Sequence, residues 1–493
     1  MSTNKYLSIE ETFNKAIEYH KIKKIYLAKE LYSEVIKKDP NHINALNNLG
    51  IIFYSLKKFD DAIKVFQKAI TVNFNFISAH NNLGLVYSEL GNFQKAIDSY
   101  EKAIKINPNS FEVLNSIGLA LSRCGEYQKA IGSYEKAIRI NPNYFRAHNN
   151  LGIIFYESGE YQKAISSYEK AIKINPNIME TYCNIGLVYE KIKETDKAIN
   201  SYLKVPKSDS NYIHAQYSYA SLLHKIKEHK KAVKIFKCID YKKSKTYLIK
   251  CLFELDDKSN FLIELDEEIN KGKTNAVIGS LITSAKIKYG IKKKNLFCED
   301  PLNYVFNKNL KKHYDFDNIF IKTSKEILND SLFKERPQPL LVNSIQSAGN
   351  IFNHKNINIK KIEHIIHKEI ENYRTNYNKS EEGLFKNWPK KYELVGWLVK
   401  MKNGGKINPH IHEPGWLSGS IYINVPPKLE DYNGNLVVSL NNQQNEILSN
   451  KNNKIIDVVT GSFCLFPASL FHYTIPFKSK EERIVLAFDV VPL

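Results

Sequence analysis

Cysteine is scarce in this sequence, and the few cysteines lie far apart. Six cysteines are spread over 493 residues, with no Cys-x-x-Cys pair among them. Disulfide frameworks and zinc ribbons need paired cysteines, so this spacing argues against both and fits a reducing compartment. Hydrophobic residues at 43% and aromatic residues at 12% are enough to build folded domains.

Long hydrophobic runs are also missing. The segment 276–285 is among the longest apolar runs, and a membrane-spanning helix needs roughly 18 such residues. The first residues, MSTNKYLSIEET, are polar and do not place a basic stretch before an apolar one, so they do not resemble a signal peptide. We therefore expect a soluble, cytoplasmic protein without a membrane partner.

Acidic residues are too few to balance the basic ones. The chain has 71 Lys and Arg against 52 Asp and Glu, a formal net charge of +19. A field of one sign supports non-specific contacts with nucleic acid but specifies nothing. The lysines occur throughout the chain, including the outer positions of the repeats described next, where solvated helix faces are the simplest interpretation. Nucleic acid is therefore not the partner that we favour.

The first half of the chain repeats itself with a period of 34 residues. An alanine follows each repeat glycine after twelve residues and an aromatic residue follows four later, as in Gly84, Ala96 and Tyr100. The repeat glycines are Gly50, Gly84, Gly118, Gly152 and Gly186. Small residues let two antiparallel helices approach closely, the aromatic ring is expected to fill the gap between adjacent helix pairs, and an Asn-Pro pair ends the unit.

These positions resemble the tetratricopeptide repeat at its usual period. The resemblance implies an all-α superhelix of about seven repeats over residues 9–246, with degenerate units at both ends and a concave inner surface. Residues 247–297 remain helical in pattern without a clear repeat, and we expect a cap or bridge there. A chain of this length should hold two or three domains.

Asparagine, or serine in the third copy, stands two residues before the repeat glycine. The asparagines are Asn48, Asn82, Asn150 and Asn184. Stacked repeats would align their amides into a ladder that offers donors and acceptors to the backbone of an extended peptide. Similar ladders are a feature of O-linked N-acetylglucosamine transferase repeats. We favour the binding of a protein or peptide, but local hydrogen bonding or solubility is an alternative explanation.

The C-terminal part has a different pattern. Helical segments are expected at about 319–330 and 357–377, and from Tyr392 onward short alternating or apolar runs lie between clusters of Gly, Pro and Asn. The runs are ELVGWLVKM, GSIYINV, GNLVVSL, KIIDVV, GSFCLF and RIVLAFDVV. They predict the strands of an all-β sandwich or barrel within a domain over residues 298–493.

Three histidines and one arginine carry the candidate chemistry. His410 and His412 are two residues apart, so in an extended strand both point to one face and can reach one metal ion. A later segment contains a glycine and a proline, which predict a turn. The short strand expected after this turn would contain His472 and hold it near the same site. Arg483 lies in an apolar strand, where an arginine is costly unless it is paired with an anion.

This constellation resembles the double-stranded β-helix (jelly-roll) of Fe(II)- and 2-oxoglutarate-dependent oxygenases, especially those fused to tetratricopeptide repeats. Ser418-Gly419, Tyr422, Gly461 and the run Phe466–Leu470 also match. The resemblance implies that His410 and His472 bind iron and that Arg483 clamps a carboxylate of 2-oxoglutarate. It further implies a dioxygenase that hydroxylates a protein or peptide held by the repeats.

Two positions depart from that family's pattern. The commonest metal triad has Asp or Glu where this chain has His412. Either His412 is the third ligand, or it lies behind the ligands and the carboxylate is missing or comes from elsewhere. Glu413 is adjacent but would face away on an ideal strand. Val485 stands where many relatives have a serine beside the cosubstrate, a role that Tyr422 could take.

Two other functions remain open. The spacing around Gly404 and Gly461 also fits a cupin, which shares the same topology, although Arg483 favours the oxygenase because a cupin has no standing need for it. The other alternative is a non-catalytic repeat scaffold whose β-domain binds metal or ligand without turnover. For Arg483 itself, a salt bridge with Glu481 or Asp489 would be the simpler explanation.

Overall fold

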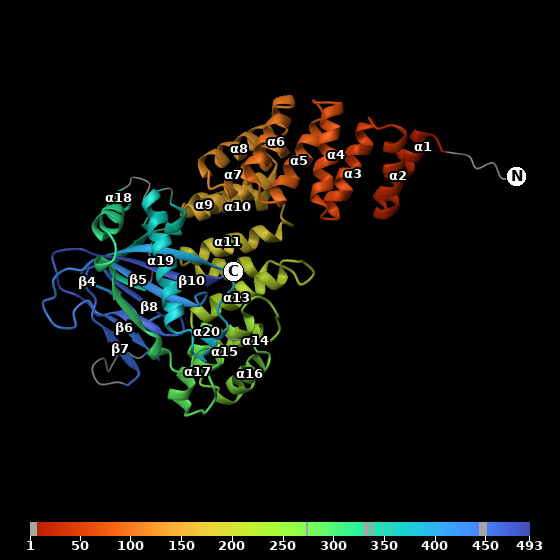
Figure 1. The fold of residues 1–493 in the computed structure, drawn as a ribbon. Coiled ribbons are helices and arrows are strands. Elements are labelled where there is room, and N and C mark those ends of the chain that lie inside the picture. The colour runs from red at the N-terminus through yellow and green to blue at the C-terminus, as the bar shows by residue number, and fades with distance from the viewer. Residues whose placement is uncertain are drawn as a thin grey trace. The chain divides into compact units, whose positions relative to one another are not determined.

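The computed structural model describes residues 7–272, 275–329, 335–336, 340–347, 349–354, 356–442 and 451–493. The chain divides into two compact units, with the division after Ile226. Figure 1 colours the helices of the first unit from red to yellow and the strands of the second mostly in blue. The sequence predicted two domain boundaries, at residues 246 and 297. They would divide the chain into smaller parts than these two units, and they stay predictions.

The first unit is built from helices joined by short turns, as the repeat pattern predicted. In the regular units a helix of 13 residues is followed by one of 14, as in α5 and α6. The helices are α1 (Ile9–Lys21), α2 (Ile25–Lys38), α3 (Ile43–Ser55), α4 (Phe59–Val72), α5 (Ile77–Glu89), α6 (Phe93–Ile106), α7 (Phe111–Arg123), α8 (Tyr127–Ile140), α9 (Phe145–Glu157), α10 (Tyr161–Ile174), α11 (Met179–Lys191), α12 (Thr195–Leu203) and α13 (Tyr212–Lys225).

The repeat glycine is needed because an aromatic ring lies against it. A Cβ atom at Gly118 would lie 2.6 Å from Cε1 of Tyr134, whose side chain is only 1% exposed. The same contact recurs in the other regular units. A buried ring held between two helices cannot move aside easily, so glycine is what allows the helices of each unit to approach.

The second unit begins with helices and ends in β-structure. Its helices are α14 (His229–Phe236), α15 (Ser244–Glu254), α16 (Lys258–Asn270), α17 (Ala276–Tyr289), α18 (Thr323–Asn329), α19 (Ile357–Asn376) and α20 (Gly383–Lys386), with a π-helix at Asp317–Lys322 and 3-10 turns at Pro301–Tyr304, Leu310–Lys312 and Ile351–Asn353. The two predicted helical segments are thus present, although residue 330 lies outside the described residues. No helix in the described part of the chain is long and apolar enough to cross a lipid bilayer.

The strands form two antiparallel sheets. The larger has the order β1-β8-β5-β10-β4-β3-β2 and the smaller β7-β6-β9. The strands are β1 (Phe306–Asn309), β2 (Glu335–Arg336), β3 (Leu341–Ser347), β4 (Tyr392–Ile407), β5 (Leu417–Asn424), β6 (Leu436–Ser439), β7 (Asn453–Ile456), β8 (Ser462–Pro467), β9 (Phe471–Thr474) and β10 (Arg483–Pro492). A helical repeat array is thus followed by a β-rich domain consistent with an oxygenase jelly-roll.

The sequence did not predict β1, β2 or β3. The segment Phe306–Asn309 is mostly polar and lacks the alternation that marks a half-buried strand. It becomes a strand because its backbone pairs with β8, where Phe306 lies opposite Leu465. Long-range pairing of this kind has no local signature in the sequence.

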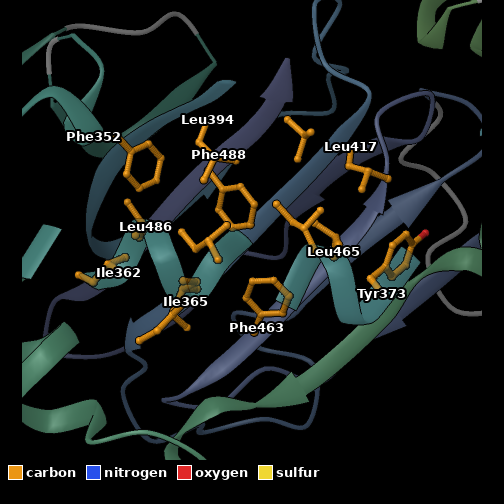
Figure 2. Packing of buried hydrophobic residues seen from close by; sticks show 14 of the residues in the cluster. Phe352, Ile362, Ile365, Tyr373, Leu394, Leu417, Phe463, Leu465, Leu486 and Phe488 are labelled. Carbon is orange, nitrogen blue, oxygen red and sulfur yellow. The ribbon is translucent and has the colours of Figure 1, made fainter. Parts of the chain in front are cut away.

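The two faces of the large sheet have different roles. Figure 2 shows side chains of β4, β5, β8 and β10, including Leu486 and Phe488, packed with side chains of helix α19 such as Ile362 and Ile365. Since side chains alternate along a strand, Val485, Ala487 and the other odd-numbered residues of β10 face the opposite side. That side lines a cavity of about 520 Å³, which also includes residues of the small sheet.

The close contact in each repeat predicts opposite effects for two glycine substitutions. Gly118→Ala forces a methyl group against the Tyr134 ring and should lower the free energy of unfolding by about 1–3 kcal/mol. Gly132, inside helix α8, has no neighbouring atom within 4 Å of such a methyl group, so Gly132→Ala should raise it by about 0.5–1 kcal/mol. Urea unfolding followed by far-UV circular dichroism measures both, and equal midpoints for the two variants would contradict the explanation.

Candidate metal centre

Three histidines come together at the cavity between the sheets. His472 lies in β9, and His410 lies just beyond the end of β4, where it forms an isolated β-bridge with His472. The His410 N–H donates to the carbonyl of His472 at 3.2 Å, and the His472 N–H donates to the carbonyl of His410 at 2.9 Å. His410 and His412 therefore lie just past the strand in which they were predicted, and pairing with β9 holds their segment.

The side chains of these histidines face one another. The ring centroids of His410 and His472 are 4.2 Å apart, and the His412 centroid is 4.8 Å from each of them. Nε2 of His410 lies 2.9 Å from Nε2 of His412. One potential ligand atom from each histidine lies within 4.8 Å of the other two, and such a group could hold one metal ion.

Burial keeps two of the imidazoles neutral. Loss of solvation is the main cause that lowers the pKa of His410 to about 4, with a smaller contribution from His412. Loss of solvation also lowers the pKa of His472 well below its usual value, again with smaller contributions from the neighbouring histidines. Neutral imidazole is the form that binds metal ions, so the site is ready to bind at neutral pH.

Asp489 is a site residue that sequence analysis missed. Its Oδ1 lies 2.6 Å from Nδ1 of His412 and accepts a hydrogen bond from Ser418 Oγ at 2.9 Å. The sequence suggested Asp489 only as a partner for Arg483. The available signal was a carboxylate in an apolar strand, on the same face as Arg483. A carboxylate on the outer nitrogen of a histidine sets its tautomer and orientation.

Glu413 does not join the histidines. Its carboxylate accepts hydrogen bonds from Tyr247 Oη at 2.7 Å and from Lys250 Nζ at 2.8 Å, both on helix α15. The expectation that Glu413 faces away from His410 and His412 therefore agrees with the structure.

Arg483 is buried, and no acidic residue in the described part of the chain forms an ion pair with it. Its Nη1 donates to the carbonyl of Gly434, whereas Nε and Nη2 form no hydrogen bond with any residue that the structure describes. Neither Glu481 nor Asp489 forms an ion pair with it, and Asp489 instead contacts His412. An unpaired cation is costly in a side chain that is 1% exposed. The arrangement therefore suits an anionic ligand such as a carboxylate.

Tyr422 lies beside this guanidinium. The Arg483 Cζ is 4.9 Å from the centre of the Tyr422 ring, and burial raises the pKa of the phenol to about 12. Tyr422 and Val485 both line the cavity. The phenol is therefore protonated at neutral pH and able to donate a hydrogen bond.

Three asparagines of the predicted ladder already form hydrogen bonds within the repeat array. Asn48, Asn82 and Asn150 each donate a hydrogen bond from Nδ2, whereas Nδ2 of Asn184 is buried without a partner. The bonds run from Asn48 to Tyr32 Oη at 3.2 Å, from Asn82 to Asn47 Oδ1 at 2.9 Å and from Asn150 to Asn115 Oδ1 at 3.0 Å. Local hydrogen bonding between units is thus one role of these residues, and a peptide-binding role stays a prediction.

The fold and these contacts define a jelly-roll domain with a cluster of three histidines, of which His472 is buried and the other two are half-buried, preceded by a helical repeat array. The family described as "Putative 2OG-Fe(II) oxygenase" matches residues 396–489, a range that includes all three histidines and Arg483. Descriptions of the tetratricopeptide repeat match residues 50–91, 77–110, 99–132, 123–159, 153–193 and 180–212. The chain therefore carries tetratricopeptide repeats and a C-terminal 2OG-Fe(II) oxygenase domain, and that family implies Fe(II) and 2-oxoglutarate.

Solved structures resemble the chain over parts of its length. The crystal structure of MamA is 27% identical and covers 35% of this chain and 96% of its own, with a TM-score of 0.32. A tetratricopeptide repeat protein from Parabacteroides merdae is 21% identical and covers 50% of this chain and 98% of its own, with a TM-score of 0.42. No curated protein matches the chain.

The metal-free protein should become less stable as the pH falls from about 6.5 to about 4. A histidine in the unfolded chain has a pKa of about 6.5, whereas burial lowers that of His410 to about 4. Between these values the unfolded chain binds a proton that the folded chain does not, so acidification lowers the free energy of unfolding by up to about 3 kcal/mol. Urea unfolding in the presence of chelator at pH 7 and pH 5 measures the loss of unfolding free energy. The loss should be smaller in His410→Asn, and an equal loss in that variant would refute the contribution of His410.

The contact between Asp489 and His412 predicts a second effect. Asp489→Asn preserves shape but removes the charge that holds the His412 proton on Nδ1, and should weaken metal binding by about 10- to 100-fold. Anaerobic titration with Fe(II) measures the affinity. Asp457→Asn, which removes a carboxylate that pairs with Lys428 and does not line the cavity, is the control. An affinity in Asp489→Asn equal to that of the control would contradict the assigned role.

Proposed function

We propose that His410, His412 and His472 bind Fe(II), that Arg483 binds 2-oxoglutarate, and that the enzyme hydroxylates a protein or peptide held by the repeats. One observation carries the proposal. A buried arginine with two donors that no described residue uses lies on the same face of β10 as residues that line the cavity of the three histidines. A metal and an anionic cosubstrate are the two partners that this combination would bind.

His412 is proposed as the third ligand in place of the usual carboxylate. Two nitrogens that bound one ion at about 2.1 Å each would lie no more than about 4.2 Å apart. The separation of 2.9 Å between Nε2 of His410 and Nε2 of His412 fits that arrangement. Asp489 then serves as the carboxylate behind the ligand and turns Nε2 of His412 towards the other histidines.

Arg483 is proposed to hold the carboxylate of 2-oxoglutarate that lies away from the metal. The guanidinium can present Nε and Nη2 side by side, which matches the two oxygens of a carboxylate. Because Val485 has no hydroxyl group, the Tyr422 phenol takes the place of the serine found in many relatives. The cosubstrate charge would remove the cost of burying Arg483 alone.

The chain itself supplies binding, orientation and exclusion of water. Iron(II) and 2-oxoglutarate together supply oxygen activation: dioxygen is consumed, 2-oxoglutarate is converted to succinate and carbon dioxide, and one oxygen atom enters a C–H bond of the substrate. Leu341, Trp397 and Met401 line the cavity on the side of β3 and β4 and keep water from the reacting groups. Asp489 keeps the proton of His412 on Nδ1.

The repeats are proposed to hold the substrate protein through the asparagine ladder. Asn82 and Asn150 each use one N–H towards the neighbouring unit. A primary amide has two N–H donors and a carbonyl acceptor, so each side chain retains capacity to bind the backbone of an extended peptide. These asparagines are half-buried, within reach of a bound chain.

A second candidate is a β-domain that binds metal or ligand without turnover, as in a cupin-like scaffold. The histidine at position 412 favours it, because a third histidine stands where the usual ligand set has a carboxylate. Such a domain would bind metal but would have no need of Arg483.

Anaerobic titration with Fe(II), with and without 2-oxoglutarate, separates these candidates. We expect a visible charge-transfer band that requires both additions, is lost in His410→Ala and His412→Ala, and is lost or much weakened in Arg483→Met. His364→Ala and Arg374→Met, which change residues outside the cavity lining, are the matched controls and should keep the band.

Substrate-independent release of succinate in air should follow the same pattern of variants. Iron binding without a response to 2-oxoglutarate would favour the cupin-like candidate. A wild-type protein that binds no iron would contradict both.

A further inference from the structure

The loop that carries two of the three histidines is attached on two sides. Residues 408–416 join β4 to β5 and contain His410 and His412. On one side the β-domain holds this loop, since the Asn408 N–H donates to the carbonyl of Leu340 at 3.0 Å and His410 pairs with His472. On the other side the attachment is Glu413, the residue directly after His412.

Glu413 is bound by one face of helix α15. Tyr247 Oη donates to its Oε2 at 2.7 Å, and Lys250 Nζ donates to its Oε1 at 2.8 Å. Lys243, at the start of the helix, donates from Nζ to the backbone carbonyl of Glu413 at 3.4 Å. Residues 243, 247 and 250 are spaced four and three apart, so they share one face of the helix.

This contact is more than a solvent-exposed ion pair. The side chains of Glu413 and Lys250 are only 24% and 26% exposed. The orientation of Tyr247 is fixed by stacking on Phe236 of helix α14. The two ring centroids lie 5.8 Å apart, and the angle between the ring planes is 14°. Phe236 is itself 2% exposed. A continuous series of contacts therefore runs from α14 through α15 to the residue beside His412.

We propose that Glu413 is a positioning residue through which helix α15 holds the loop of His410 and His412 in its metal-binding geometry. The inference rests on the proposed function, because it assigns the histidines as ligands. Ligands that are held before the ion arrives bind it more tightly than ligands that must first be ordered. The helical segment after the repeats is thus part of the metal site, although none of its residues touches the metal.

The chain contains a control contact with the same donor types, more exposed than the Glu413 contact: the Lys288 and Asp256 side chains are 41% and 66% exposed. Asp256 also accepts hydrogen bonds from a tyrosine and a lysine, Tyr289 Oη at 2.7 Å and Lys288 Nζ at 2.9 Å. This second cluster lies in the same helical segment and includes no residue of the loop 408–416. Its isosteric variants Asp256→Asn and Tyr289→Phe therefore test the general effect of loosening the helices.

The experiment measures the anaerobic affinity for Fe(II) and the position of the 2-oxoglutarate charge-transfer band in Glu413→Ala, Glu413→Gln, Tyr247→Phe and the two controls. We expect Glu413→Ala to weaken iron binding by about tenfold or more and to shift the band. Tyr247→Phe should have a smaller effect in the same direction, and Glu413→Gln, which keeps an acceptor, should recover part of the loss. The controls should match wild type in affinity and band position.

Three results would overturn the inference. The first is a wild-type affinity and band in Glu413→Ala. The second is an equal loss in Asp256→Asn, which would mean that any loosening of the helices is enough. The third is a wild-type protein that binds no iron, which would overturn the proposed function as well. In the first two cases wild type still binds iron, so the proposed function would stand.

Discussion

The alternation of side chains along β10 constrains both the stability and the chemistry of the C-terminal domain. Ile484, Leu486 and Phe488 pack in the apolar core with helix α19. The residues between them must therefore point to the opposite face, where the cavity lies. A shift of one residue in the pairing of β10 would exchange the two sets and bury charges in the apolar layer. The apolar core thus fixes the register that presents Asp489 to the cavity and places Arg483 on the same face of β10.

The two charged residues on that face are satisfied to different degrees. Asp489 has two partners, His412 and Ser418, and so completes its hydrogen bonding within the protein. Among the described residues, Arg483 donates a hydrogen bond to the carbonyl of Gly434 and lies beside the Tyr422 ring, and two of its nitrogen atoms form no hydrogen bond. A satisfied buried charge orients its neighbours, whereas a partly satisfied one favours a ligand of opposite charge. The same strand therefore serves both the histidine cluster and the proposed anion site.

The repeats show how small residues determine the packing of helices. In each regular unit the repeat glycine lies under a buried aromatic ring, which sets the separation of the two helices. The alanines of the second helix are buried to the same extent as that ring, for example Ala130 and Ala137 beside Tyr134. These contacts are local to each unit. The pattern can therefore be repeated along the chain, while the outer and half-buried positions remain available for recognition.

The sequence by itself determined the features that depend on local spacing. The period of 34 residues predicts the helix pairs, and alternating runs predict six strands of the jelly-roll. The spacing of His410 and His412 predicts that they share a face. Only the tertiary structure decided which distant groups meet these elements. Asp489 reaches His412 across 77 residues and Tyr247 reaches Glu413 across 166, and β1 becomes a strand only by pairing with β8. Contacts at such separations follow from the packing of whole elements, which no local pattern of residues encodes.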